Sequence, residues 1–224
     1  ALKFVEQNQG RPFFLYLSHF AVHDPLQGRA DLVRKYQAKL ARLPRREGQP
    51  FVLEGNPDSP NPLSRAERDS LLSQAAYQGF HVLPRRTVKI KQRQDNVQFA
   101  AMIESLDQSV GRVLAKLQRL GLEDQTIVAF CSDNGGMSAA NFGRPARVIS
   151  PDQLDAAFST SNLPLRGGKG WLYEGGIRIP LIVKWPGRAR ARTVCDVPVI
   201  TTDFYPSLLE MIGLPARPEQ HPDG

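Results

Sequence analysis

The spacing of apolar and polar residues predicts short apolar strands that alternate with helices. Short continuous apolar runs, several of them rich in aromatic or β-branched residues, are typical of strands inside a sheet that is covered on both faces. We expect such strands at residues 12–18, at 126–131, from 179 up to Pro186-Gly187, and at 197–200.

The clearest helix is predicted over residues 95–120. Asp95 is expected to cap its start and Gly121 to end it, while Glu104 and Asp107 are interpreted as solvated positions. Its apolar stripe consists of Leu106, Val110, Val113, Leu114 and Leu117. Further helices are expected over 31–43, from a cap at Ser64 with Glu67 at the capping-box spacing to about Tyr77, and from Thr202 to Gly213.

Helices and apolar strands in this order predict an α/β fold, with a mostly parallel sheet and helices on both faces. Residues 44–63 are rich in Pro, Gly and Asn, and we expect an irregular surface insertion there. The stretch 81–94, "HVLPRRTVKIKQRQ", is given no assignment.

Composition narrows the possible classes of protein. With 224 residues, 41% of them hydrophobic and 23% charged, the chain can bury a sizeable core, and no apolar run is long enough to cross a membrane. The net charge of +7 comes from scattered Arg and Lys with few interleaved aromatics, which indicates a solvated surface or attraction of anionic substrates, and no nucleic-acid partner. Cys131 and Cys195 are expected as buried or half-buried thiols.

Polar residues follow two of the predicted strands, where ligands of open α/β sheets bind. His19 and His23 follow the first strand, and Asp133 and Asn134 follow the second. Asp and Asn oxygens suit Ca²⁺ or Mg²⁺, and the glycines at 135–136 allow a sharp turn and the close approach of a ligand. The same "SDNGG" is also a good turn sequence, so both interpretations stay open.

A glycine-rich segment, 159–180, precedes the third strand. Lys169 stands between two glycines there and is a candidate contact for a sulfate or phosphate oxygen, although such loops are also plain connectors. Arg166 is a weaker candidate for an anion contact. Glu174 and Arg178 are expected to form an ion pair that orders this loop.

Taken together and in this order, four segments resemble the sulfatase family of the alkaline phosphatase superfamily. They are "RPFFLYLSHFAVHDP", "FAAMIESLDQSVGRVLAKLQRLGLEDQTIVAFCSDNGG", "STSNLPLRGGKGWLYEGGIRIPLIVKWPG" and "TTDFYPSLLEMIGLP". The resemblance implies that Asp133 and Asn134 coordinate Ca²⁺ (Mg²⁺ in some members), that His23 hydrogen-bonds the sulfate ester, and that Lys169 binds a sulfate oxygen. His19 is either a residue on the substrate side or a polar strand cap.

The family's nucleophile is a formylglycine, made from Cys or Ser in a C/S-x-P-S/A-R motif, and this chain contains no such motif. We therefore expect residues 1–224 to be the middle-to-C-terminal part of a sulfatase catalytic domain, with the formylglycine upstream. The chain alone is expected to be inactive.

The predicted function is that of a sulfuric ester hydrolase acting with a divalent metal on a sulfated small molecule or glycan. Two alternatives stay open: a phosphodiesterase or phosphonate hydrolase relative, and a non-catalytic, sulfatase-like binder of sulfated glycans. The resemblance implies that the intact protein is exported to the periplasm, the medium or a lysosome.

Overall fold

The chain folds into two units, Ala1–Gly187 and Arg188–Gly224. The computed structural model describes residues 1–44, 47, 51–56, 59–61, 63–74, 87–139, 159–215 and 217–220.

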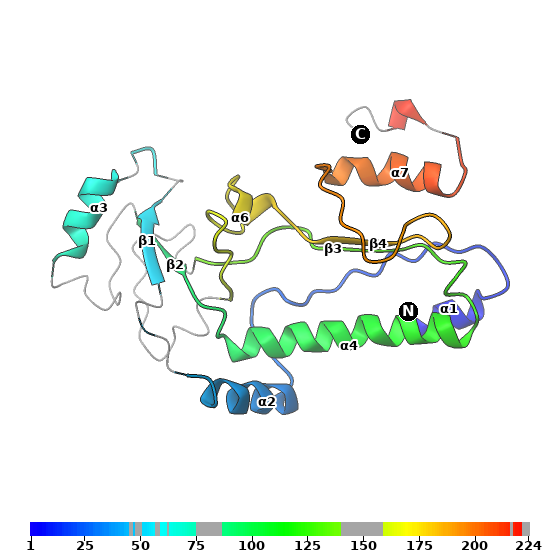
Figure 1. Ribbon diagram of the computed structural model, residues 1–224, viewed down its shortest axis with the longest axis horizontal. Coiled ribbons are helices and arrows are strands. Elements are labelled where there is room, and N and C mark those ends of the chain that lie inside the picture. Colours follow the sequence, from blue (N-terminus) through cyan, green and yellow to red (C-terminus); the bar gives the residue numbers. More distant parts are fainter. Residues whose placement is uncertain are drawn as a thin grey trace. The chain divides into compact units, whose positions relative to one another are not determined.

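A long helix, α4 (Val97–Arg119), organises the first unit. In Figure 1, α2 (Ala30–Ala41) lies beside the N-terminal half of α4, and α1 (Leu2–Gln7) lies near its C-terminal end. The buried apolar side chains of these three helices are Val5, Leu32, Ala101, Met102 and Leu117. The helices predicted over 31–43 and 95–120 are thus confirmed to within a few residues.

The cap of α4 differs from the prediction. Asn96 is the N-cap, and its side-chain oxygen accepts a hydrogen bond from the backbone N–H of Phe99 at 3.0 Å. Asp95 does not cap the helix, because its carboxylate bonds the ammonium group of Lys91 at 2.6 Å. Gly121 has a φ of +68° and follows the end of the helix, as predicted.

Glu104 is not the solvated position that the sequence predicts. Both of its carboxylate oxygens accept hydrogen bonds from the Lys35 ammonium group, at 2.8 and 2.7 Å, and Gln108 donates a further one. These hydrogen bonds, first the one from Lys35 and then one from Tyr36, hold the pKa of Glu104 below its usual value. Asp107, by contrast, is exposed as predicted.

The described strands form two antiparallel pairs. In the first pair, β1 (Phe51–Gly55) runs against β2 (Thr87–Lys91); in the second, β3 (Val128–Cys131) runs against β4 (Leu181–Lys184). The α/β class is confirmed. The expected parallel neighbours are not found among the described strands. Each described sheet consists of two strands, and both pairs are antiparallel.

Three strand and loop predictions differ from the structure. Residues 12–18 and 197–200 are not strands, and Phe14 and Tyr16 are 74% and 81% exposed. A strand needs a neighbour for its backbone hydrogen bonds, and these segments have no ladder partner among the described residues. The insertion predicted as irregular over 44–63 contains β1.

Helix α3 (Arg65–Leu72) begins as predicted. The Ser64 hydroxyl accepts from the Glu67 N–H at 3.3 Å, and the Glu67 carboxylate accepts from the Ser64 N–H at 2.8 Å. The helix ends before the predicted limit of about Tyr77, which lies outside the described residues. Ser73 ends it, since its hydroxyl donates to the backbone carbonyl three residues earlier.

The second unit contains the predicted C-terminal helix. A 3₁₀ turn, η3 (Thr201–Asp203), leads into α7 (Phe204–Met211), and a second short turn, η4 (Pro218–Gln220), follows. The Asp203 carboxylate accepts the Ile200 N–H at 2.7 Å, which fixes the start of this helical stretch.

Both cysteines, Cys131 and Cys195, are exposed, contrary to the prediction of buried or half-buried thiols. Cys131 is the last residue of β3, where burial alternates along the strand and its position falls on the exposed side. In the part of the chain that the structure describes, no helix is both long enough and apolar enough to cross a membrane.

Candidate functional site

The candidate site begins where β3 ends, in a turn that we call the Asp133 loop (residues 132–136). The Ser132 hydroxyl donates to the backbone carbonyl of Asn134 at 2.9 Å, which ties the turn together. Asp133 is exposed and Asn134 is half-buried, so both side chains are open to a ligand from solvent.

A second segment, the Lys169 loop (residues 159–178), is hydrogen-bonded directly to the Asp133 loop. The backbone N–H of Lys169 donates to the carbonyl of Gly136 at 3.0 Å, and the N–H of Gly135 donates to the carbonyl of Gly176 at 2.8 Å. Gly176 belongs to the short helix α6 (Glu174–Ile177). The structure therefore joins the segments that carry Asp133, Asn134 and Lys169.

Glycines make this contact possible. A Cβ atom at Gly135 would lie 1.9 Å from the carbonyl oxygen of Gly175, and one at Gly176 would lie 2.1 Å from that of Trp171. The sequence predicts close approach of a ligand to the glycines of the Asp133 loop; what packs closest to Gly135 is the backbone of the Lys169 loop. Gly170 has a φ of +94°, a conformation that favours glycine beside Lys169.

Two residues that the sequence analysis missed bridge the loops. The side-chain amide of Asn162 donates to the carbonyl oxygens of Gly136 at 2.7 Å and Gly167 at 3.1 Å. The buried hydroxyl of Ser138 also donates to Gly167, at 3.0 Å. No local sequence pattern marks either residue, because the Ser138 bond and one of the two Asn162 bonds go to backbone carbonyls far along the chain.

An apolar cluster holds the Lys169 loop against β2. Trp171 is 5% exposed and packs with Val88 and Ile90 of β2 and with Ala139. The N–H of Lys91 donates to the carbonyl of Ser138 at 2.9 Å, which extends the contact from β2 to the segment after the Asp133 loop. The Lys169 loop is thus anchored by burial of an aromatic ring as well as by hydrogen bonds.

The charged residues of the Lys169 loop differ in environment. Lys169 is half-buried, and the pair of Glu174 and Arg178, at 3.6 Å, is present as predicted and lies at the surface. The guanidinium of Arg166 stacks 3.9 Å from the centroid of the Tyr173 ring, a cation–π contact. The anion contact suggested for Arg166 stays a prediction.

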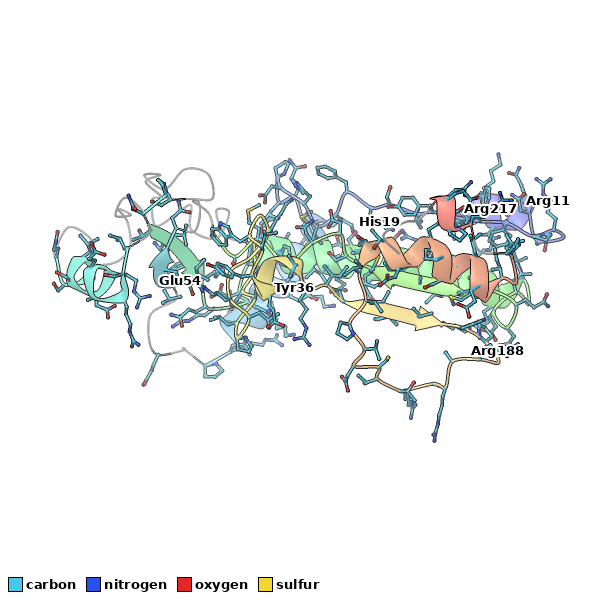
Figure 2. All side chains as sticks on the ribbon, turned by 90° about the horizontal axis from the view of Figure 1, so that it is seen from above. Arg11, His19, Tyr36, Glu54, Arg188 and Arg217 are labelled. Carbon is cyan, nitrogen blue, oxygen red and sulfur yellow. The ribbon has the colours of Figure 1, made fainter. Side chains whose placement is uncertain are left out.

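The two histidines follow the segment that was predicted to be the first strand. His23 is exposed; its Nδ1 lies 2.8 Å from the carbonyl oxygen of Asp24 and its ring is 5.3 Å from that of Phe20. His19, which Figure 2 labels, is exposed as well, and a turn at residues 21–22 separates it from His23. The contacts shown for His23 are within its own loop, whereas the Asp133 and Lys169 loops contact each other.

A buried cation on β2 was also missed, because residues 81–94 carry no secondary-structure prediction. The Lys89 side chain is fully buried and its ammonium group lies 4.6 Å from the centroid of the Phe51 ring. Burial lowers the pKa of Lys89 to about 8. Lys89 and Lys91 share one face of β2, opposite the face of Val88 and Ile90.

The donor atoms of the Asp133 loop fit a hard divalent cation. Asp133 and Asn134 present a carboxylate and an amide oxygen, the donor types that Ca²⁺ and Mg²⁺ prefer. Two residues supply only part of the roughly six to eight oxygens that surround Ca²⁺. No group of three or more His, Cys, Asp or Glu residues suited to a metal occurs among the described residues, so these two fit as part of a ligand set.

Comparison with known proteins identifies the class to which this α/β unit and its paired loops belong. The family model described as Sulfatase matches residues 1–214. The chain belongs to the sulfatase family.

The chain is similar to several curated members. It is 33% identical to a sulfatase of Formosa agariphila over 224 residues, which cover 95% of this chain and 28% of that protein. It is 36% identical to mouse steryl-sulfatase over 111 residues, covering 50% of this chain and 16% of the relative. It is 33% identical to mouse N-acetylgalactosamine-6-sulfatase over 122 residues, covering 54% and 21% respectively.

A solved structure shares the fold. The crystal structure of Ps i-CgsB in complex with k-i-k-neocarrahexaose matches with a TM-score of 0.61 and 24% identity, covering 100% of this chain and 34% of that one. Two curated relatives match this chain along nearly its whole length, and the chain spans about a quarter to two fifths of their length.

Proposed function

We propose that this chain is part of an enzyme that hydrolyses sulfate esters, with Asp133 and Asn134 holding a divalent cation and Lys169 and His23 binding the sulfate group. The observation that carries the proposal is the direct bonding of the two loops. Two backbone hydrogen bonds hold the Lys169 loop beside the Asp133 loop. The N–H of Lys169 donates to the Gly136 carbonyl at 3.0 Å, and the N–H of Gly135 donates to the Gly176 carbonyl at 2.8 Å.

This arrangement suits a group that carries negative charge. A cation at Asp133 and Asn134 and an ammonium group at Lys169 would both attract oxygens of one sulfate, and oriented charge of this kind is commonly the largest contribution to catalysis. Because the Lys169 loop is anchored by buried Trp171, the ammonium group is carried on a fixed backbone. The cation is Ca²⁺ in this proposal, or Mg²⁺, and when bound it would act as a Lewis acid.

His23 would donate a hydrogen bond to the ester oxygen of the substrate. Its exposure leaves the ring open to a ligand. The nucleophile, a formylglycine, would be supplied by a part of the intact protein outside this chain. The rivals, a phosphodiesterase or phosphonate hydrolase and a non-catalytic binder of sulfated glycans, are outcomes of the test below.

The substrate class is a sulfated small molecule or glycan. Among the relatives, one is named for a steryl group and another for an acetylated amino sugar, so the family name fixes the ester and not the alcohol. Export of the intact protein belongs to the same proposal and is checked by locating the protein in cell fractions.

The test is the release of inorganic sulfate by the intact protein from an aryl sulfate and from sulfated oligosaccharides, with matched phosphodiesters in parallel. We expect sulfate release that a chelator abolishes and added Ca²⁺ restores. The variant Asp133→Ala/Asn134→Ala should lose this metal-dependent activity, by a factor of about 10³ or more, because a main source of positive charge is gone. Asp107→Asn, an exposed change on α4, is the matched control and should be neutral.

Three outcomes contradict the proposal. Release of phosphate in place of sulfate would make the protein a phosphodiesterase relative. Tight binding of sulfated glycans with no turnover would make it a binder. Full activity of the double variant would remove Asp133 and Asn134 from the metal site.

A further inference from the structure

We infer that Asn162 is a positioning residue that sets the place of Lys169 relative to the Asp133 loop, an inference that rests on the proposed function. Its two side-chain hydrogen bonds end on one backbone carbonyl in each loop. They run to Gly136 at 2.7 Å and to Gly167 at 3.1 Å.

Each of these two carbonyls receives a second hydrogen bond. Gly136 also accepts the backbone N–H of Lys169 at 3.0 Å, and Gly167 also accepts the Ser138 hydroxyl at 3.0 Å. A carbonyl oxygen has two lone pairs, so both acceptors are fully used. Asn162 and the backbone of Lys169 thus share one acceptor, the last residue of the Asp133 loop.

The backbone at this junction is closely packed around two glycines. A Cβ atom at Gly168, the residue before Lys169, would lie 2.4 Å from the Ser138 hydroxyl, 2.7 Å from the Gly136 carbonyl and 3.0 Å from the Asn162 amide nitrogen. A Cβ at Gly136 would lie 2.7 Å from the Asn162 side-chain oxygen. Loss of the amide would therefore leave each of the two carbonyls with one of its two hydrogen bonds, at a junction where the glycine backbone is already closely packed.

Asn162 differs from the residues of the proposed site in how it would act. Both of its side-chain hydrogen bonds go to backbone carbonyls, so in this proposal it orients the loop and does not contact substrate or cation. A change at Asn162 should therefore alter sulfate affinity only by displacing Lys169. That dependence separates a positioning residue from one that only adds stability.

The experiment measures the affinity of the intact protein for inorganic sulfate by calorimetry in Ca²⁺ buffer, in a double-mutant cycle of Asn162→Ala and Lys169→Ala. We expect Lys169→Ala to weaken sulfate binding by about 10²-fold and Asn162→Ala by about tenfold. The double variant should be no weaker than Lys169→Ala alone, because Asn162 acts through the lysine. Asn162→Asp keeps the shape but cannot donate to two carbonyls, so it should not restore affinity.

Asn8 provides a matched control. Asn8 is buried, Asn162 is half-buried, and the Asn8 amide likewise donates to a backbone carbonyl, that of Phe4 in α1 at 2.7 Å. Asn8→Ala should leave sulfate affinity unchanged. A second measurement needs no ligand: amide hydrogen exchange at Lys169 should speed up at least tenfold in Asn162→Ala and not in Asn8→Ala.

The outcomes separate the two proposals. Two results would overturn the role of Asn162 without contradicting the proposed function. In one, the wild type binds sulfate and Asn162→Ala binds it equally well. In the other, the double variant loses more affinity than Lys169→Ala alone. A wild-type protein that neither binds nor releases sulfate overturns the proposed function. In that case unchanged exchange at the Lys169 amide of Asn162→Ala would still count against the positioning role.

Discussion

At the scale of single residues, the two loops of the candidate site are held together by side chains that donate to backbone carbonyls. Asn162 and Ser138 are such residues. Neither could be found from the sequence, because only the folded chain brings these carbonyls near, and an Asn or Ser in a polar loop is expected whatever its role. Asp133, Asn134 and Lys169, by contrast, stand out in the sequence because polar groups follow a strand or interrupt a glycine run.

Gly135 was singled out from the sequence, and it lies at the closest contact between the two loops. Gly135 was expected to let a ligand approach, and the structure gives the Lys169 loop as the group that approaches. The structure gives close backbone packing as a reason for glycine at this position, and the approach of a ligand stays a prediction. Close packing of backbone on backbone leaves no room for a methyl group.

Gly135→Ala should force the two loops apart. The added Cβ would meet the Gly175 carbonyl at 1.9 Å, so the loops must separate, at a cost of about 1–3 kcal/mol in the free energy of unfolding. Gly111→Ala, in α4 where nothing beyond the local helix backbone lies within 4 Å of the added group, should stabilise the protein by about 0.5–1 kcal/mol. Urea unfolding of the two variants checks both signs; equal effects would contradict the packing of the loops.

At the scale of elements, helices were predicted well and strands less well. The start of α3 and the end of α4 follow from local signals, a capping box and a glycine of positive φ, which act within a few residues. The strand predicted over 12–18 has the right apolar sequence but no ladder partner among the described residues. Strand formation depends on a neighbour that local sequence does not name.

The contact of α2 with α4 carries a pH-dependent prediction. Lys35 lowers the pKa of Glu104 below its unfolded value, so this pair stabilises the fold above the ordinary glutamate pKa of about 4.3. The contribution is lost as the pH falls through the lower, folded-state pKa. The stability of the fold therefore falls toward acid, as expected for a carboxylate whose charged form is favoured by folding.

Glu104→Gln should therefore lower the thermal midpoint at neutral pH, and the difference from wild type should vanish in acid below the folded-state pKa. Asp107→Asn, an exposed position on the same helix, is the control and should show no such convergence. Thermal unfolding followed by circular dichroism over this pH range makes the comparison. A difference that persists in acid would mean that Glu104 contributes by packing and not by charge.

At the scale of the whole molecule, the class of fold was predictable and the sheet was not. Alternation of helices and apolar runs gave the α/β class, and the family match over residues 1–214 agrees with it. The described strands nevertheless form two antiparallel pairs, and large apolar side chains on 12–20 and on β4 are exposed, Phe20 and Ile182 among them. The strand pairs of the described residues could not be predicted because local apolar patterns do not say which strands become neighbours.

The most direct test of the central claim is a crystal structure of the intact protein grown with Ca²⁺ and inorganic sulfate, with the cation located by anomalous scattering. We predict one Ca²⁺ bound by the side-chain oxygens of Asp133 and Asn134, and one sulfate whose oxygens contact both that cation and the ammonium group of Lys169. A cation or a sulfate found only at other residues, with the Asp133 and Lys169 loops still bonded as described, would contradict the account.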